Sequence, residues 1–170
     1  TIDADFAAEL RLRAINAYNV AKANPGACQT APCVSPYYYE EDNYVDDMEL
    51  AAAQMYQSTG DPRYLLDAVE YGRQEPVTPW MGADSAHHYQ WYPFVNIGHA
   101  MLAMDRNKKV SEEFIRNMRS GLQRVADRAN GNAFMHGIPF IWCSNNLTVA
   151  FITQAMLYRE ITGDNSYREI

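Results

Sequence analysis

The sequence predicts an all-α fold in which helical hairpins form two layers. Apolar residues recur every three or four positions along most of the chain, as they do in amphipathic helices. No segment alternates polar and apolar residues for long enough to predict a strand. Thr-Gly-Asp occurs at residues 59–61 and again at 162–164, and this offset of 103 also places Tyr64 on Tyr167 and Asn43 on Asn146. Residues that would cap helices, form turns and begin helices thus recur with one offset, which indicates repeated helical hairpins.

The first three helices are expected over residues 3–22, over residues 45–58 and from Pro62 onward. The first helix ends before Asn24-Pro25-Gly26, which does not continue a helix. Gly60 suits the left-handed residue after the second helix, while Asp61 and Pro62 suit the cap and first residue of the third. The apolar side of the first helix is expected to consist of Phe6, Leu10, Ala14, Ala17, Tyr18 and Ala21.

The last three helices are expected over residues 93–104, from Ser111 as an N-cap, and over residues 146–162. The fourth and sixth helices are apolar on almost every side, whereas the fifth has a charged side and an apolar side. A helix that is apolar all round is buried on all sides. We therefore expect the second, fourth and sixth helices to form an inner layer and the others an outer layer, in a toroid or part of one.

The composition is that of one globular domain, with 170 residues, 48% apolar and 21% charged. A net charge of -7 argues against binding of nucleic acid or of an anionic membrane surface, because both require clustered basic residues. No apolar run approaches the roughly 20 residues that a transmembrane helix needs. The first residue, Thr1, and the last, Ile170, which falls just inside a new helix, lead us to expect a piece of a longer chain.

The three cysteines do not identify a redox or metal site. Cys28 and Cys33 enclose a four-residue loop and could form a local disulfide, bind a metal or remain free thiols. The sequence leaves these three alternatives open. Cys143 is expected to be a small buried residue.

The segments that lead into the inner helices hold all three tryptophans and three of the four histidines. Since inner helices alternate with outer ones, these segments are expected to converge on one end of the bundle, as binding loops do on rigid scaffolds. Aromatic rings beside carboxylates, amides and imidazoles suit a neutral ligand rich in hydroxyl groups, such as a sugar. The alternative is that several of these rings only cap the core. The aromatic residues are Tyr37, Tyr38, Tyr39, Tyr44, Trp80, Tyr89, Trp91, Tyr92, Phe134, Phe140 and Trp142.

Two acids and one interior histidine have simple structural interpretations. Asp46 and Asp47 fall in the first turn of a helix, where the helix dipole alone favours acids, although glycoside hydrolysis also uses paired carboxylates. His99 is expected to be an interior histidine with hydrogen-bond partners. No metal site and no cofactor is predicted, because the remaining histidines lack the spacing of two ligands on one helix: His87, His88 and His136.

Three blocks of the sequence together resemble a known family. They are YYYEEDNYVDDMELAAAQMYQSTGDPRYL, PWMGADSAHHYQWYPFVNIGHAMLA and WCSNNLTVAFITQAMLYREITGD. In this order they resemble the middle of the catalytic domain of glycoside hydrolase family 9, over about residues 17–170. The resemblance implies an (α/α)6 barrel, an inverting mechanism, β-1,4-glucan substrates such as cellulose, and a secreted, periplasmic or cell-surface bacterial enzyme.

The resemblance also implies positions that bind sugar. Tyr38 and Tyr39 match an aromatic pair of the family, and Trp91 and Trp142 match tryptophan platforms before two inner helices. Asp46-Asp47 matches a family acid pair that is not the catalytic couple. We expect the substrate-binding residues to be Tyr38, Tyr39, Trp91, Trp142, His87, Asp42 and Asn145.

The family's catalytic residues have no counterpart in the sequence. The general base of the family lies in an Asp-Ala-Gly-Asp motif, which Gly82-Ala83-Asp84 does not fit, and its general acid follows a His-Arg motif that is also missing. Inversion needs both carboxylates, roughly 6.5 to 9.5 Å apart. Residues 1–170 are therefore expected to be one domain, the central portion of a catalytic domain, whose partners are a β-glucan and the remaining segments of that domain. The alternative is a separate α-helical module that binds glycan or a protein partner without hydrolysis.

Overall fold

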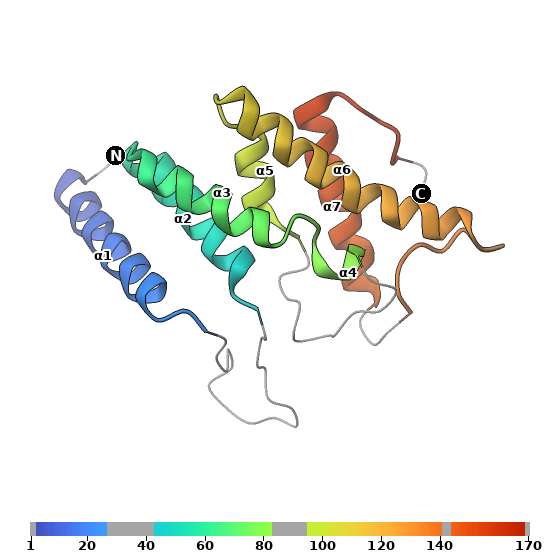
Figure 1. The fold of residues 1–170 in the computed structure, drawn as a ribbon, viewed down its shortest axis with the longest axis horizontal. Coiled ribbons are helices and arrows are strands. Elements are labelled where there is room, and N and C mark those ends of the chain that lie inside the picture. Colours follow the sequence, from blue (N-terminus) through green and yellow to red (C-terminus); the bar gives the residue numbers. More distant parts are fainter. Residues whose placement is uncertain (1–2, 27–42, 83–94, 141–143, 169–170) are drawn as a thin grey trace, which may run out of the picture.

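The computed structural model describes residues 3–26, 43–82, 95–140 and 144–168, and every regular element within these ranges is a helix (Figure 1). The all-α prediction is confirmed for this part of the chain. The helices are α1 (Ala4–Ala23), α2 (Val45–Thr59), α3 (Pro62–Gln74), α4 (Pro79–Gly82), α5 (Ile97–Ala103), α6 (Lys108–Asn130) and α7 (Ser144–Thr162).

The repeated Thr-Gly-Asp sequence ends α2 and α7 in the same way. Gly60 and Gly163 both have left-handed backbones, with φ of 72° and 78°, and glycine adopts this conformation without strain. Each glycine amide donates to the carbonyl four residues earlier, at 2.8 and 2.7 Å. The Asp61 side chain then accepts a hydrogen bond from the backbone amide of Arg63 at 3.0 Å. The Asp164 side chain accepts the corresponding bond from the amide of Ser166 at 2.9 Å. The predicted repeat is therefore a structural repeat as well.

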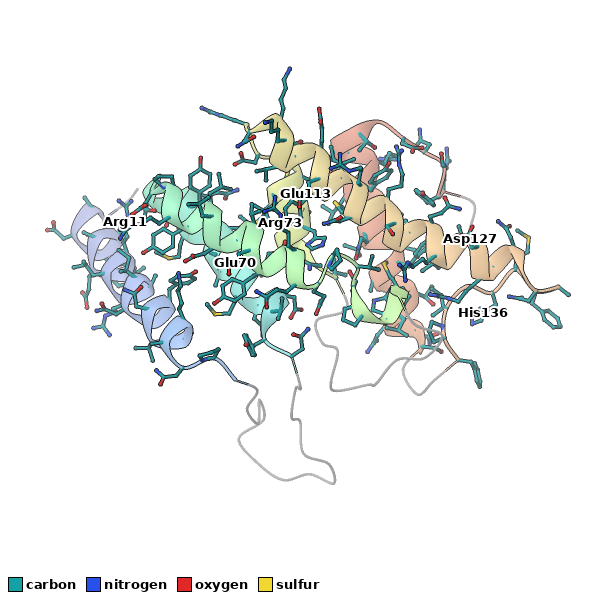
Figure 2. The ribbon with its side chains drawn as sticks, in the orientation of Figure 1. Arg11, Glu70, Arg73, Glu113, Asp127 and His136 are labelled. Atoms are coloured by element: carbon teal, nitrogen blue, oxygen red, sulfur yellow. The ribbon has the colours of Figure 1, made fainter. Side chains whose placement is uncertain are left out.

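The helices form the expected two layers, with α3 and α6 in front of α2, α5 and α7 in Figure 1. Residues 98–103 of α5 are all buried, as expected for an inner helix. Helix α6 buries one side only, which packs on α5 and α7. Arg73 of α3 and Glu113 of α6 pair across the outer layer at 2.7 Å, and Figure 2 shows them facing each other.

Several predicted helix boundaries are wrong because asparagines cap two helices. Asn107, not Ser111, is the N-cap of α6, and the Ser111 hydroxyl donates instead to the Ala103 carbonyl at 2.6 Å. Helix α5 begins at residue 97 rather than 93, since the Asn96 side chain accepts the His99 amide at 2.9 Å. Helix α7 begins two residues earlier than expected, and α4 was not predicted because four residues carry no periodic pattern.

The predicted apolar side of α1 is mostly exposed. Tyr18 is buried, where it packs edge-on against Tyr64 with ring centroids 5.1 Å apart and donates to Asp67 at 2.8 Å. The other five residues assigned to that side, including Phe6 and Leu10, are exposed. Helix α7 also exposes apolar residues on one side, so its expected burial all round is wrong: Val149, Ile152 and Met156. Both outermost helices of this array thus present apolar surface to solvent.

Among the helices of the described ranges, none combines the length and the apolarity that crossing a lipid bilayer requires.

Candidate functional site

Polar side chains gather at the end of the bundle where the inner helices begin. We call these residues the inner-helix cluster: Asn43, Asp46, Glu49, Glu75, Asn96 and His99. They come from the start of α2, the end of α3 and the start of α5. Residues 27–42 and 83–94, which hold most of the predicted sugar-binding positions, connect to the chain at this end. Asn43 is the first described residue after residues 27–42, and Asn96 is the second after residues 83–94, so the cluster borders the expected binding loops in sequence.

Glu49 joins α2 to α5 through two hydrogen bonds. Its Oε1 lies 2.7 Å from His99 Nδ1, and its Oε2 accepts the Asn96 side-chain amide at 3.1 Å. Glu49 is 0% exposed and His99 1% exposed. A buried carboxylate is strongly destabilising unless it is paired in this way. The interaction fixes the first turn of α5 on α2, because Asn96 is also the N-cap of α5.

Both ring nitrogens of His99 face acceptors. Nδ1 meets the Glu49 carboxylate, and Nε2 lies 3.3 Å from the Pro76 carbonyl oxygen. Nε2 donates to the Pro76 carbonyl while one proton is shared between Nδ1 and the Glu49 carboxyl group, so both nitrogens of the buried ring have partners. Phe114 packs edge-on against the ring with centroids 4.9 Å apart and keeps this pair out of water.

Glu75 and Asp46 are partly buried carboxyl groups near each other. The Asn43 amide donates to Glu75 Oε2, and the buried Oε1 has no hydrogen-bond partner among the described residues. Burial, followed by the charge of Asp46, raises the pKa of Glu75 to about 7. Burial, followed by the charge of Asp47, raises the pKa of Asp46 to about 6. Asp46 therefore does more than complement the dipole in the first turn of α2, because its surroundings also favour its protonated form.

The pKa of Glu75 predicts a pH-dependent stability. Its folded-state pKa of about 7 lies above the ordinary value of 4.5, so the folded protein binds a proton at Glu75 more tightly than the unfolded protein does. This contribution to stability is complete below pH 4.5 and is lost as the pH rises through 7. Glu75→Gln should therefore raise the free energy of unfolding at pH 8 by about 1 kcal/mol, allowing for partial solvation, and change it little at pH 4.5. Urea denaturation at the two pH values measures this.

Glu113→Gln is the matched control for that experiment. Arg73 lowers the pKa of Glu113, so its replacement should reduce stability at pH 8 rather than raise it. Equal effects of Glu75→Gln at both pH values would contradict the assignment of a raised pKa to Glu75.

The predicted sugar-binding residues lie mainly outside the described ranges. Asn145 is placed, exposed in the first turn of α7. The others are in the remaining parts of the chain: Tyr38, Tyr39, Asp42, His87, Trp91 and Trp142. Trp80, which the sequence placed among the loop aromatics, is instead 0% exposed in α4 and belongs to the core. Within the described residues, no three His, Cys, Asp or Glu side chains are arranged to hold a metal ion.

Sequence reasoning predicted His99 as a satisfied interior residue but missed its partners. Glu49 lies on the buried side of α2, three residues from Ala52 and one turn from the helix start. An acid among apolar residues at helical spacing is a signal of a buried, paired carboxylate, because an unpaired one would unfold the helix packing. Glu75 carried no such signal, since it follows α3 directly and resembles a solvated helix end.

Comparison with known proteins gives one match. A family model described as glycosyl hydrolase family 9 matches residues 1–170. No curated protein and no solved structure matches the chain.

Proposed function

Because this chain belongs to glycosyl hydrolase family 9, we propose that it supplies sugar-binding subsites to an inverting hydrolase of β-1,4-glucans such as cellulose. The observation that carries the proposal is the family match over all 170 residues. The two-layered helices and the aromatic residues in the segments that lead into α2, α5 and α7 support it. A β-glucan is accordingly the proposed ligand, and a secreted, periplasmic or cell-surface location the proposed compartment, since polymeric glucan is met there.

The proposed subsites combine stacking and hydrogen bonding. Aromatic rings pack on the apolar faces of pyranose rings, and carboxylates, amides and imidazoles bind the hydroxyl groups at the ring edges. Asn145 is exposed at the start of α7 and is available for such a hydrogen bond. The stacking residues would be Tyr38, Tyr39, Trp91 and Trp142, with Asp42, His87 and Asn145 as polar partners.

The catalytic base and acid are proposed to come from polypeptide outside these 170 residues. The sequence holds no Asp-Ala-Gly-Asp motif, and Asp46 and Glu75 of the inner-helix cluster are held in contacts among helices. Further segments of the catalytic domain would cover the exposed apolar sides of α1 and α7. The missing motif also favours the alternative of a non-catalytic α-helical module that binds glycan or a protein partner.

Trp142→Ala should weaken binding of soluble β-glucan about tenfold, because one stacking platform is removed. Retardation of the purified 170-residue chain in native gels containing increasing β-glucan measures the affinity. Phe6→Ala is the control, since it removes an exposed aromatic ring on α1, away from the proposed site. Wild-type chain that migrates equally with and without glucan would refute the proposed function.

A further inference from the structure

Two glutamates of the inner-helix cluster each bind an asparagine at the start of an inner helix. The Asn43 side-chain amide donates to Oε2 of Glu75, at the end of α3. The Asn96 side-chain amide donates to Oε2 of Glu49, in α2, at 3.1 Å. We call these pairs the Asn–Glu bridges. Two different helix starts thus use the same kind of bond to a neighbouring helix.

Each of these asparagines also binds the backbone of its own helix. Asn43 Oδ1 accepts the amide of Val45, the first residue of α2, at 3.0 Å. Asn96 Oδ1 accepts the amide of His99, in the first turn of α5, at 2.9 Å. The side-chain oxygen therefore caps one helix while the nitrogen binds another. An aspartate could replace only the first function, because its carboxylate has no donor.

The Asn–Glu bridges lie where the expected binding segments rejoin the helices. Asn43 directly follows residues 27–42, and Asn96 follows residues 83–94 after one intervening residue. Asp42, a predicted sugar-binding residue, immediately precedes Asn43 in the sequence. Each bridge therefore holds the residue at which a segment with predicted sugar-binding positions meets the rigid scaffold.

Glu75 is an unfavourable residue for a purely structural contact. Its Oε1 is buried without a hydrogen-bond partner among the described residues. The titratable groups that act on it include Asp46 and Glu49 of α2 and His99 of α5, so two of its neighbours are acids. An unpaired buried oxygen beside other carboxyl groups lowers stability. Such departures from stable packing are expected at functional positions, which indicates a role beyond packing.

We propose that Asn43 and Glu75 are positioning residues for glucan binding, because the bond between them fixes the point at which residues 27–42 join α2. A segment whose end is already fixed loses less conformational entropy when a ligand binds. This inference rests on the proposed function, since it takes β-glucan as the ligand. The test uses this bridge because Glu49 of the other one is fully buried, and variants there would also disturb the core.

Asn43→Asp tests the bridge while keeping the cap of α2. The variant retains an oxygen for the Val45 amide but places a carboxylate against Glu75. At pH 8 the two like charges repel, so affinity for soluble β-glucan in native gel retardation of the 170-residue chain should fall at least about threefold. Adding Glu75→Gln reverses the bond, since the glutamine amide donates to the new carboxylate, and should recover most of the loss. Glu75→Gln alone completes the cycle.

The loss in Asn43→Asp should also depend on pH, as a simple packing defect would not. At pH 5 the two facing carboxyl groups share a proton and form a hydrogen bond, so the ratio of wild-type to variant affinity should be smaller than at pH 8. Asn107→Asp is the matched control. It makes the same chemical change at the N-cap of α6, whose side chain accepts the Lys109 amide at 3.1 Å, and should leave the affinity unchanged.

Different outcomes separate the positioning role from the proposed function. Wild-type affinity in Asn43→Asp at pH 8, with weakened binding in Trp142→Ala, would overturn the positioning role and leave the proposed function standing. Weakened binding that Glu75→Gln does not recover would show that Asn43 acts without Glu75 and would also overturn the inference. No retardation of the wild-type chain would overturn the proposed function and, with it, this inference.

Discussion

Replacing His99 with alanine is expected to lower the free energy of unfolding by about 3–5 kcal/mol. The substitution leaves the fully buried Glu49 carboxylate without the donor that lies 2.7 Å away, and it also removes a donor from the Pro76 carbonyl. Removal of one partner of a buried pair strands the other charge, which is why the expected loss exceeds that of an exposed pair. Urea denaturation followed by circular dichroism measures the change.

A double variant distinguishes the stranded charge from simple loss of packing. Glu49→Met combined with His99→Leu replaces both groups by apolar side chains of similar size and should recover a large part of the loss. Arg73→Ala removes the partner of the more exposed Glu113 and should cost less than about 1 kcal/mol. A loss in His99→Ala no larger than that in Arg73→Ala would contradict the buried pair.

Trp80→Ala is expected to lower the free energy of unfolding by a similar amount, about 3–5 kcal/mol. Trp80 is 0% exposed and is held in α4, a short helix whose Met81 carbonyl accepts from Arg128 at 2.8 Å. The substitution leaves a cavity in the core, because the whole Trp80 side chain is buried. Thermal denaturation should show a correspondingly large fall in the melting temperature.

The same variant separates core aromatic residues from those that bind glycan. Below its melting temperature, Trp80→Ala should retain wild-type affinity for β-glucan, whereas Trp142→Ala should not. If Trp80→Ala kept its stability and lost glucan binding, Trp80 would belong to the binding surface after all.

The sequence predicted the fold well because the helices repeat a strong pattern. The Thr-Gly-Asp repeat required a left-handed glycine and a capping aspartate at both ends, and both were found. The predicted helix boundaries were wrong where one capping side chain decides where a helix begins. Asn107 caps α6, for example, where Ser111 was expected. The predicted burial of one side of α1 was wrong for another reason. Periodicity identifies the apolar side of a helix but not whether another element covers it.

The candidate site was less predictable because it depends on contacts distant in sequence. His99 meets a glutamate fifty positions earlier, and the pKa of Glu75 is raised because the surrounding helices bury it and because Asp46 lies beside it. Side-chain spacing along one helix contains no information about such pairs. Trp80 shows the same limit, since the sequence around a buried tryptophan does not distinguish it from a tryptophan that stacks on a sugar.

Release of reducing sugar by the purified 170-residue chain decides whether these residues hold the catalytic carboxylates. The chain would be incubated with soluble β-glucan and with xyloglucan at concentrations that retard it in native gels. We expect binding with no reducing ends above the enzyme-free blank, because inversion needs two carboxylates and the motifs that carry them are missing from the sequence. Sustained release above that blank would show that the catalytic carboxylates lie within these residues.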